Sequence, residues 1–249
     1  MIKLFLRDVI SFVLYLFLLG RKRRGTVTLV YHSISDLDPR LDPVKINVTP
    51  GNFEEQLKAI LPYQDRVQIT FDDGYENNYS QAFPLLKKYG LRATFFITTD
   101  FIDRTIGPEA FGYAEPKIGP MCWDEIREMR LEGMRIGSHT RTHVNLARSD
   151  SDRLKAELLD SKRRIEEMAG YRVSDLAYPY GNKGSYNTAV KDAVKEAGYE
   201  HAYTNIMGSN EPGHSDNFAL KRIRVYNDDS PFKLRMKIRG AYDWVDRIA

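Results

Sequence analysis

Short apolar segments alternate with amphipathic ones along most of the chain. Runs of apolar, β-branched and aromatic residues bounded by turn residues predict buried strands, and apolar residues spaced three and four apart predict helices. We expect strands at residues 26–31, 67–71, 93–98, 134–138, 175–178, 201–204 and 219–225. We expect helices at residues 50–61, from the second of these strands to about residue 89, and at residues 123–133, 149–170, 187–197 and 231–240.

Seven strand–helix units emerge from this pattern. Such alternation predicts an α/β fold with a parallel sheet, and the seventh unit suggests a closed or nearly closed barrel. Because a chain of 249 residues can bury one sizeable core, we expect residues 26–249 to form a single domain. Residues 99–120 are rich in glycine and proline, which predicts a long loop that could form a wall or lid. We expect Ser149 to cap the helix that begins there, with Asp152 three residues on.

The first 25 residues differ from the rest of the chain. Residues 9–19 form an almost unbroken apolar run, which Arg21-Lys22-Arg23-Arg24 follows directly. At about 1.5 Å per residue, a helix of this run spans about half of the roughly 30 Å hydrocarbon core of a bilayer. Extending the helix back to Ile2 adds polar residues that share one helical face and suit a membrane interface. These residues are Lys3, Arg7, Asp8 and Ser11.

The charge of the chain is concentrated at this end. The formal net charge is +3, but six basic residues and one acidic residue give residues 1–25 a charge of +5, which leaves −2 for the remainder. We therefore expect no nucleic-acid partner. No small-x-small cleavage pattern follows the apolar run, so we do not expect a removed signal peptide. Because the four basic residues resist translocation, we expect an interfacial membrane anchor with the barrel on the cytoplasmic face. An ordinary buried helix is the alternative.

Two adjacent carboxylates follow the strand at residues 67–71. Asp72 and Asp73 lie in the run Thr70-Phe71-Asp72-Asp73-Gly74. Neighbouring side chains of an extended chain point in opposite directions, so the two acids suit different roles. A solvated turn is the alternative, because Asp-Asp-Gly is ordinary loop chemistry.

Two of the five histidines, His139 and His143, follow the strand at residues 134–138. They lie on one face if the segment turns helically, and imidazole is the commonest side-chain ligand of divalent metals. With Asp73 they would make a three-ligand site that keeps a position open for water or substrate. The sole cysteine, Cys122, excludes an intrachain disulfide, and we expect it to be packed.

Three motifs together resemble the polysaccharide deacetylases of carbohydrate esterase family 4. They are Thr70-Phe71-Asp72-Asp73-Gly74, Ser138-His139-Thr140-x-x-His143 and Ala177-Tyr178-Pro179-Tyr180-Gly181, in the order of the family. The similarity covers roughly residues 26–240, and the third motif is most similar to the branch of the poly-N-acetylglucosamine deacetylases. The resemblance implies the distorted (β/α)7 barrel of this family. It also implies a metal-dependent hydrolase, with zinc the expected metal, that removes N-acetyl groups from aminosugars of a polysaccharide or a lipid-linked glycan.

The resemblance also implies a role for each motif residue. Asp73, His139 and His143 would hold the metal, which polarises a carbonyl and activates a water. Asp72 would act as the general base on that water. The backbone N–H of Tyr180 would stabilise the tetrahedral intermediate. The Tyr180 side chain is as suited to packing as to contacting sugar.

The sequence departs from the common family pattern in two places. Ala177 stands where many members carry an arginine that orients the base. Arg222 of the last predicted strand could replace it, with a solvated edge residue as the alternative. The late Leu-x-His motif that supplies the general acid in many members is not found. His32, at the end of the first strand, fits that role, although it could also only cap the strand. We expect His214, in a polar loop, to be solvated.

Two further functions stay open. One is a membrane-attached glycan-binding module that has lost turnover, which the retention of both aspartates and both histidines disfavours. The other is a deformylase that acts on a lipid-linked aminosugar with the same metal chemistry.

Overall fold

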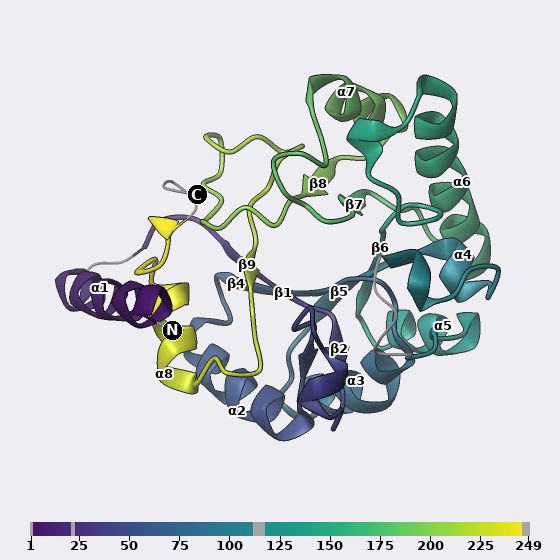
Figure 1. Cartoon of the computed structure of the whole chain (residues 1–249). Helices are drawn as coiled ribbons and strands as arrows, with labels where there is room; N and C mark the ends of the chain where they lie inside the picture. The colour runs from purple at the N-terminus through teal and green to yellow at the C-terminus, as the bar shows by residue number, and fades with distance from the viewer. Residues whose placement is uncertain (1, 21–22, 112–117, 246–249) are drawn as a thin grey trace.

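The computed structural model describes residues 2–20, 23–111 and 118–245, and its centre is a curled sheet of seven parallel strands (Figure 1). The strands pair in the order β8-β7-β6-β5-β4-β1-β9, and β2 and β3 form a separate two-stranded sheet. The strands are β1 (Val27–Tyr31), β2 (Ser33–Ile34), β3 (Asn47–Val48), β4 (Val67–Phe71), β5 (Ala93–Ile97), β6 (Arg135–Ser138), β7 (Asp175–Ala177), β8 (His201–Tyr203) and β9 (Ile223–Arg224).

Helices surround the outer face of this sheet (Figure 1). The α-helices are α1 (Ile2–Leu18), α2 (Pro50–Ile60), α3 (Phe83–Lys88), α4 (Thr99–Ile102), α5 (Trp123–Leu131), α6 (Ser151–Ala169), α7 (Thr188–Glu196) and α8 (Pro231–Ile238). All five residues of β1 are buried, as expected of a parallel strand covered on both faces. The prediction of an α/β fold with a parallel seven-stranded sheet is confirmed. The sheet β2-β3 was not predicted, because two-residue strands leave no periodicity to detect.

The strand predicted at residues 219–225 is split in the structure. Leu220 pairs with Tyr203 of β8, whereas β9 pairs with β1. Between these two points the backbone N–H of Arg222 donates to Ile206 O at 3.0 Å. The sheet is therefore a curled half-barrel and not the closed or nearly closed barrel that the sequence predicted. The segment from Leu220 to Arg224 runs from β8 to β1 and pairs with each of them. The split also turns the Arg222 side chain into the interior, where it is 0% exposed.

Three predicted elements differ from the structure in detail. The helix predicted at residues 149–170 is capped by Asp150, whose carboxylate accepts from Arg153 N at 2.9 Å, and not by Ser149. The helix predicted after the Asp-Asp pair is present, but it contains a π-helical turn at Asn78–Ala82 directly before α3. The loop predicted at residues 99–120 contains α4 and a short 3-10 helix at Pro108–Phe111, while residues 112–117 lie outside the described part.

Helix α1 turns its polar face toward the protein. Ser11 is fully buried and accepts from Trp244 Nε1 at 3.1 Å. Asp8 accepts from the Tyr242 hydroxyl at 3.1 Å. The guanidinium of Arg7 lies 5.7 Å from the centre of the Tyr242 ring. The polar face that the sequence placed toward an interface is therefore used for docking α1 onto the C-terminal part of the chain.

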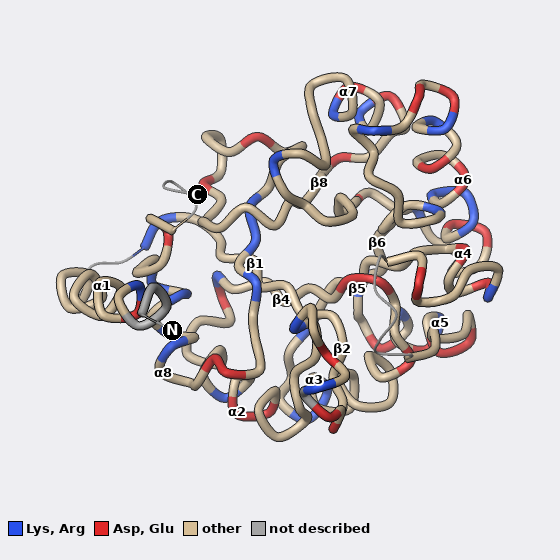
Figure 2. Tube along the Cα trace, viewed as in Figure 1, with Lys and Arg blue, Asp and Glu red and all other residues tan. Residues whose placement is uncertain are grey.

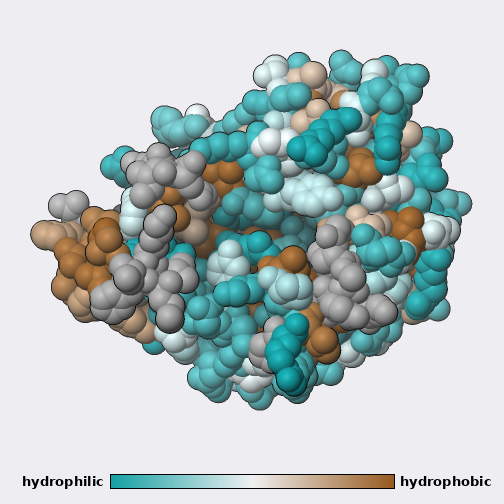
Figure 3. Space-filling view, viewed as in Figure 1, coloured by the Kyte–Doolittle hydropathy of each residue, from teal (hydrophilic) through white to brown (hydrophobic). Residues whose placement is uncertain are grey.

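The apolar face of α1 points outward. Its exposed side chains are Leu6, Val9, Ile10, Phe12, Val13, Leu14, Leu16 and Phe17. These hydrophobic residues gather over α1 in the space-filling view (Figure 3). The alternative of an ordinary buried helix is wrong, because a buried helix would cover these side chains. Within the described residues, no helix combines the length and the apolar character that crossing a bilayer requires.

The basic run after α1 is only partly free to face a membrane. Arg23 donates to Asp243 Oδ2 at 2.5 Å and to the carbonyl oxygen of Ile238 at 3.0 Å, so it docks on the body of the protein. Arg24 is exposed, and Arg21 and Lys22 lie outside the described residues. Elsewhere basic and acidic residues are interspersed, for example along α6 (Figure 2).

Candidate metal centre and active site

The residues singled out in the sequence meet at the carboxyl ends of the strands. Asp72 and Asp73 follow β4, and His139 and His143 follow β6. His32 directly follows β1. In a parallel sheet these ends lie at one edge, which is why residues far apart in the chain share one cavity.

Asp73, His139 and His143 form a buried cluster. Each offers one ligand atom, and these atoms all lie within 4.8 Å of one another. Asp73 Oδ1 lies 3.4 Å from His139 Nε2 and 3.5 Å from His143 Nε2. Ligand atoms held at about 2.0–2.2 Å around a tetrahedral metal are about 3.3–3.6 Å apart. The carboxylate-and-imidazole donor set and these separations fit a small divalent metal ion.

The two imidazoles are presented as neutral ligands. His139 Nδ1 lies 2.8 Å from Ala177 O, so it carries the proton and donates to that carbonyl, leaving the Nε2 lone pair for the cluster. Burial lowers the pKa of His139, and it lowers the pKa of His143 well below its usual value. Metal ligation requires the neutral imidazole, and hydrogen bonding of the other ring nitrogen orients such ligands.

The segment from His139 to His143 is a strained loop and not the helical turn expected from the four-residue spacing. Thr140 has φ 67° and His143 has φ 59°, in the left-handed region. Two backbone N–H groups of this loop, those of Arg141 and Thr142, donate to Glu157 Oε2 at 3.0 and 2.8 Å. Glu157 of α6, which sequence reasoning missed, therefore fixes the loop that brings the two histidines together.

Asp72 is held apart from this cluster by Arg222. Two guanidinium nitrogens donate to the two carboxylate oxygens at 2.7 Å each, and both side chains are fully buried or nearly so. Burial is the largest single influence and raises the pKa of Asp72, but the charges of Arg222 and the nearby histidines and the hydrogen bonds from Arg222 together exceed it and bring the pKa to about 2. Asp72 is thus a fixed carboxylate, and the alternative of a solvated Arg222 is wrong.

Arg222 and Ala177 both pack against the ring of Phe96. Ala177 is fully buried and packs with Phe96, and Arg222 lies over that ring with its guanidinium carbon 5.6 Å from the centroid. Arg222 also donates to Asn205 Oδ1 at 2.9 Å and to Thr204 O at 2.9 Å. The arginine beside Asp72 therefore comes from the last segment of the chain.

His32 lines the same cavity as the cluster. Burial lowers the pKa of His32 to about 3, with Arg224 and Arg222 acting in the same direction and Asp72 opposing them. Its imidazole is consequently neutral at pH 7 in the metal-free protein. His214 is exposed and lines a different cavity, as expected of a solvated loop residue.

Tyr180 contributes an unusual backbone geometry. It has φ 64°, and its ring lies 5.0 Å from that of His143 with 43% of the residue exposed. The next residue, Gly181, donates to Pro179 O at 2.8 Å, whereas the Tyr180 N–H enters no backbone hydrogen bond within the described part of the chain. An amide left available beside the cluster can stabilise negative charge on a bound group.

The cavity around the cluster measures about 450 Å³. Sequence reasoning missed several residues of its wall, namely Val44, Ile46, Phe111, Asn182, Asn205 and Arg224. Phe111 comes from the segment predicted as a wall or lid, and its ring lies 4.8 Å from that of His143. Trp123, at the start of α5, does not line this cavity, and it donates from Nε1 to Asp103 at 2.7 Å.

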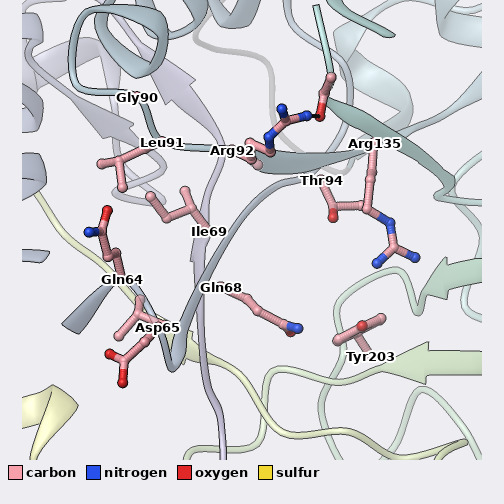
Figure 4. A pocket seen from close by; sticks show the side chains of 13 residues that line it. Gln64, Asp65, Gln68, Ile69, Gly90, Leu91, Arg92, Thr94, Arg135 and Tyr203 are labelled. Carbon is pink, nitrogen blue, oxygen red and sulfur yellow. Dashed lines mark hydrogen bonds between the residues drawn. The ribbon is translucent and has the colours of Figure 1, made fainter. Parts of the chain in front are cut away.

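A larger cavity of about 590 Å³ lies near the amino ends of β4, β5 and β6 (Figure 4). Gln68 and Thr94 point into it, and Arg135 of β6 and Tyr203 of β8 lie to their right in the view (Figure 4). Its lining contains no histidine among the described residues, and the metal-ligand cluster is at the opposite ends of the strands. We therefore place the chemistry in the smaller cavity.

Comparison with known proteins agrees with this geometry. A model of the family described as “Polysaccharide deacetylase” matches residues 62–202. The YxkH protein of Bacillus subtilis (strain 168) is 33% identical over 222 residues, covering 79% of this chain and 70% of that protein. The poly-beta-1,6-N-acetyl-D-glucosamine N-deacetylase of Staphylococcus epidermidis is 24% identical over 242 residues, covering 83% of this chain and 81% of that protein. The Streptococcus pyogenes deacetylase PplD, solved in complex with acetate, has a TM-score of 0.73 at 24% identity and covers 87% of this chain and 99% of its own; this likeness shows the fold.

Proposed function

Because the chain belongs to the polysaccharide deacetylase family, whose members hydrolyse the N-acetyl amides of sugars, we propose that it is a zinc-dependent deacetylase of aminosugars in a glycan. The observation that carries the proposal is the buried cluster of Asp73, His139 and His143 beside the Asp72–Arg222 pair. A glycan-binding module would need neither a fixed carboxylate base nor three convergent metal ligands.

A divalent metal held by Asp73, His139 and His143 would polarise the amide carbonyl and lower the pKa of a water molecule. The carboxylate of Asp72 takes the proton from the attacking water. Arg222 holds that carboxylate through both oxygens, which fixes its position and keeps it ionised. The Tyr180 N–H donates to the oxygen on which negative charge develops.

The leaving amine needs a proton, and we propose that His32 donates it. Its imidazole is neutral in the resting site, so it must first take up a proton. Asp72 acquires one when it deprotonates water, and it passes this proton to His32, which lines the same cavity, so the Asp72 carboxylate is restored. We assign His32 as the general acid that passes this proton to the amine.

The substrate we propose is an N-acetylated glycan presented at a bilayer surface. Relatives whose names specify a substrate include an enzyme for poly-beta-1,6-N-acetyl-D-glucosamine, which supports an N-acetylhexosamine at the metal. The outward apolar face of α1 supports an interfacial anchor of the whole chain. The basic residues from Arg21 to Arg24 favour the cytoplasmic face.

The test is mass spectrometry of the acids released from a panel of N-acylated glycans by the zinc-loaded protein, with and without a chelator. We expect chelator-sensitive release of acetate from N-acetylglucosamine oligomers. Release of formate but not acetate would identify the deformylase alternative. Absence of both acids, with binding to the oligomers retained, would contradict an enzyme and support a binding module.

A further inference from the structure

A second cavity adjoins the metal cavity, and we call it the annex. It measures about 370 Å³, a size at which proteins hold small ligands. The two cavities share four lining residues, namely Tyr180, Asn182, Asn205 and Arg224. A group attached to a sugar in the metal cavity can therefore extend into the annex without leaving the protein surface.

The annex is lined by cations. Arg7 comes from α1, Lys237 from α8 and Arg224 from β9, so three distant parts of the chain converge on one space. The described lining contains no carboxylate, and its other members are uncharged. Such a site selects an anionic group.

The positive charge of the annex is only partly neutralised. Arg7 contacts Asp8 at 3.1 Å, and Lys237 is paired with Asp229, both carboxylates lying outside the lining. Arg224 forms no ion pair within the described residues, and its buried Nε atom has no hydrogen-bond partner there. Its Nη2 donates to Val44 O at 3.1 Å. The guanidinium also lies over the ring of Tyr226, 5.3 Å from its centre. One guanidinium that no carboxylate of the described residues pairs with thus lies on the boundary between the two cavities.

We propose that the annex binds a phosphate ester attached to the aminosugar whose acetamide reaches the metal centre. Guanidinium groups match phosphate oxygens in geometry as well as charge, and two of the three cations are arginines. This inference rests on the proposed function and narrows its substrate class to N-acetylated sugar phosphates.

The position of Arg7 favours a phosphate over a carboxylate on a second sugar. Arg7 belongs to the polar face of α1, and the opposite face of the same helix carries the exposed apolar side chains. Along the path from the metal cavity through the annex to α1, the protein thus presents metal ligands first, then cations, and then an apolar surface. A sugar, a phosphate and a lipid chain follow one another in the same order in a glycosyl phosphate lipid.

The test compares kcat/KM for acetate release from two substrates that differ only in the anionic group. One is an octyl phosphodiester of an N-acetylhexosamine, and the other is the uncharged octyl glycoside of the same sugar. We expect at least about a tenfold preference for the phosphodiester, the size of one charge-assisted contact. A third substrate, the sugar phosphate without the octyl chain, separates a lipid-linked source of the phosphate from a soluble one.

Variants then assign the preference to the annex. Arg7→Gln should reduce the ratio of the two kcat/KM values about fivefold or more, mainly through KM, and Arg7→Lys should retain part of it because it keeps the charge. Arg153→Gln is the matched control, since Arg153 is exposed on α6 and should keep the wild-type ratio. Thermal melting checks that each variant is folded.

Equal kcat/KM for both substrates in the wild-type protein would overturn the proposal, even if no Arg7 variant folded. An unchanged ratio in folded Arg7→Gln would also overturn it. Neither result touches the proposed function, because acetate would still be released. Absence of acetate from every substrate would instead reject the proposed function itself.

Discussion

Arg222 and Asp72, 150 positions apart in the chain, form a doubly hydrogen-bonded ion pair in the protein interior, with both contacts at 2.7 Å. Arg222 is 0% and Asp72 1% exposed. A buried charge without its partner is strongly destabilising, so the pair ties the last segment of the chain to the end of β4. It therefore joins the stability of the fold to the orientation of the catalytic carboxylate.

Removing one partner should reveal this double role. Arg222→Gln leaves the Asp72 carboxylate buried and unpaired, and we expect a loss of about 3–5 kcal/mol in the free energy of unfolding, measured by urea denaturation. Arg163→Gln is the control, because its pair with Asp160 is exposed and should contribute less than about 1 kcal/mol. Similar losses in the two variants would show that the buried Arg222–Asp72 pair matters no more for the free energy of unfolding than an exposed pair does.

The two neighbouring aspartates should separate metal binding from turnover. Asp73→Ala removes a ligand, and we expect it to lose zinc, as should His139→Ala, whereas wild-type protein binds about one ion per chain. Asp72→Asn should retain the metal and lose about 10²-fold or more in kcat, the size expected of a general base. Elemental analysis and acetate-release assays measure the two properties. Loss of metal from Asp72→Asn with retention in Asp73→Ala would reverse the assignment.

His32 should matter only when the leaving group needs a proton. We expect His32→Ala to slow amide hydrolysis strongly and to spare esters with good leaving groups, because only the departing amine must be protonated. The comparison uses kcat on matched amide and ester substrates. His214→Ala is the control and should be nearly silent, since His214 lies outside the metal cavity. Equal losses on amide and ester in His32→Ala would indicate a structural role.

The outward face of α1 should determine membrane binding. Leu16 and Phe17 are 49% and 73% exposed, and replacing both with serine should lower binding to anionic vesicles at least about tenfold in a sedimentation assay. The matched control is Leu131→Ser on α5, where the leucine is 80% exposed but not on this face. A vesicle-binding loss as large in the control, or none in the double variant, would contradict the anchor.

Protease protection tests on which side of the membrane the protein lies. On the cytoplasmic face, the barrel should resist protease added to intact cells and to spheroplasts, and become sensitive only after lysis. Rapid digestion in intact spheroplasts would place it outside. Recovery of the full-length protein in the soluble fraction would contradict membrane association altogether.

The helix caps provide a test of local structure. Asp150→Ala should cost about 1 kcal/mol in the free energy of unfolding, because the carboxylate accepts from the Arg153 N–H at 2.9 Å. Ser149→Ala is the matched control and should cost less, since Ser149 only donates weakly to Asn145 O at 3.4 Å. A larger loss for Ser149→Ala than for Asp150→Ala in urea denaturation would instead support Ser149 as the cap, as the sequence predicted.

The sequence by itself determined the seven strand–helix units and the residues of the metal cluster. The strands are short apolar runs, and the parallel arrangement collects their carboxyl ends at one edge, so the position of Asp73 or His139 after a strand is enough to place it. The motif spacing also named His143. The expected helical turn was wrong, however, because the segment is a loop with two residues in the left-handed region, and Glu157 fixes it.

Only the tertiary structure decided how charges are paired and which way surfaces face. Arg222 has the same sequence signature whether it is solvated or buried, and only the split of the last strand turns it onto Asp72. The polar face of α1 could have faced water, but its contacts with Tyr242 and Trp244 turn it inward. Periodicity reports that a helix has two faces, whereas long-range packing selects which of them is covered.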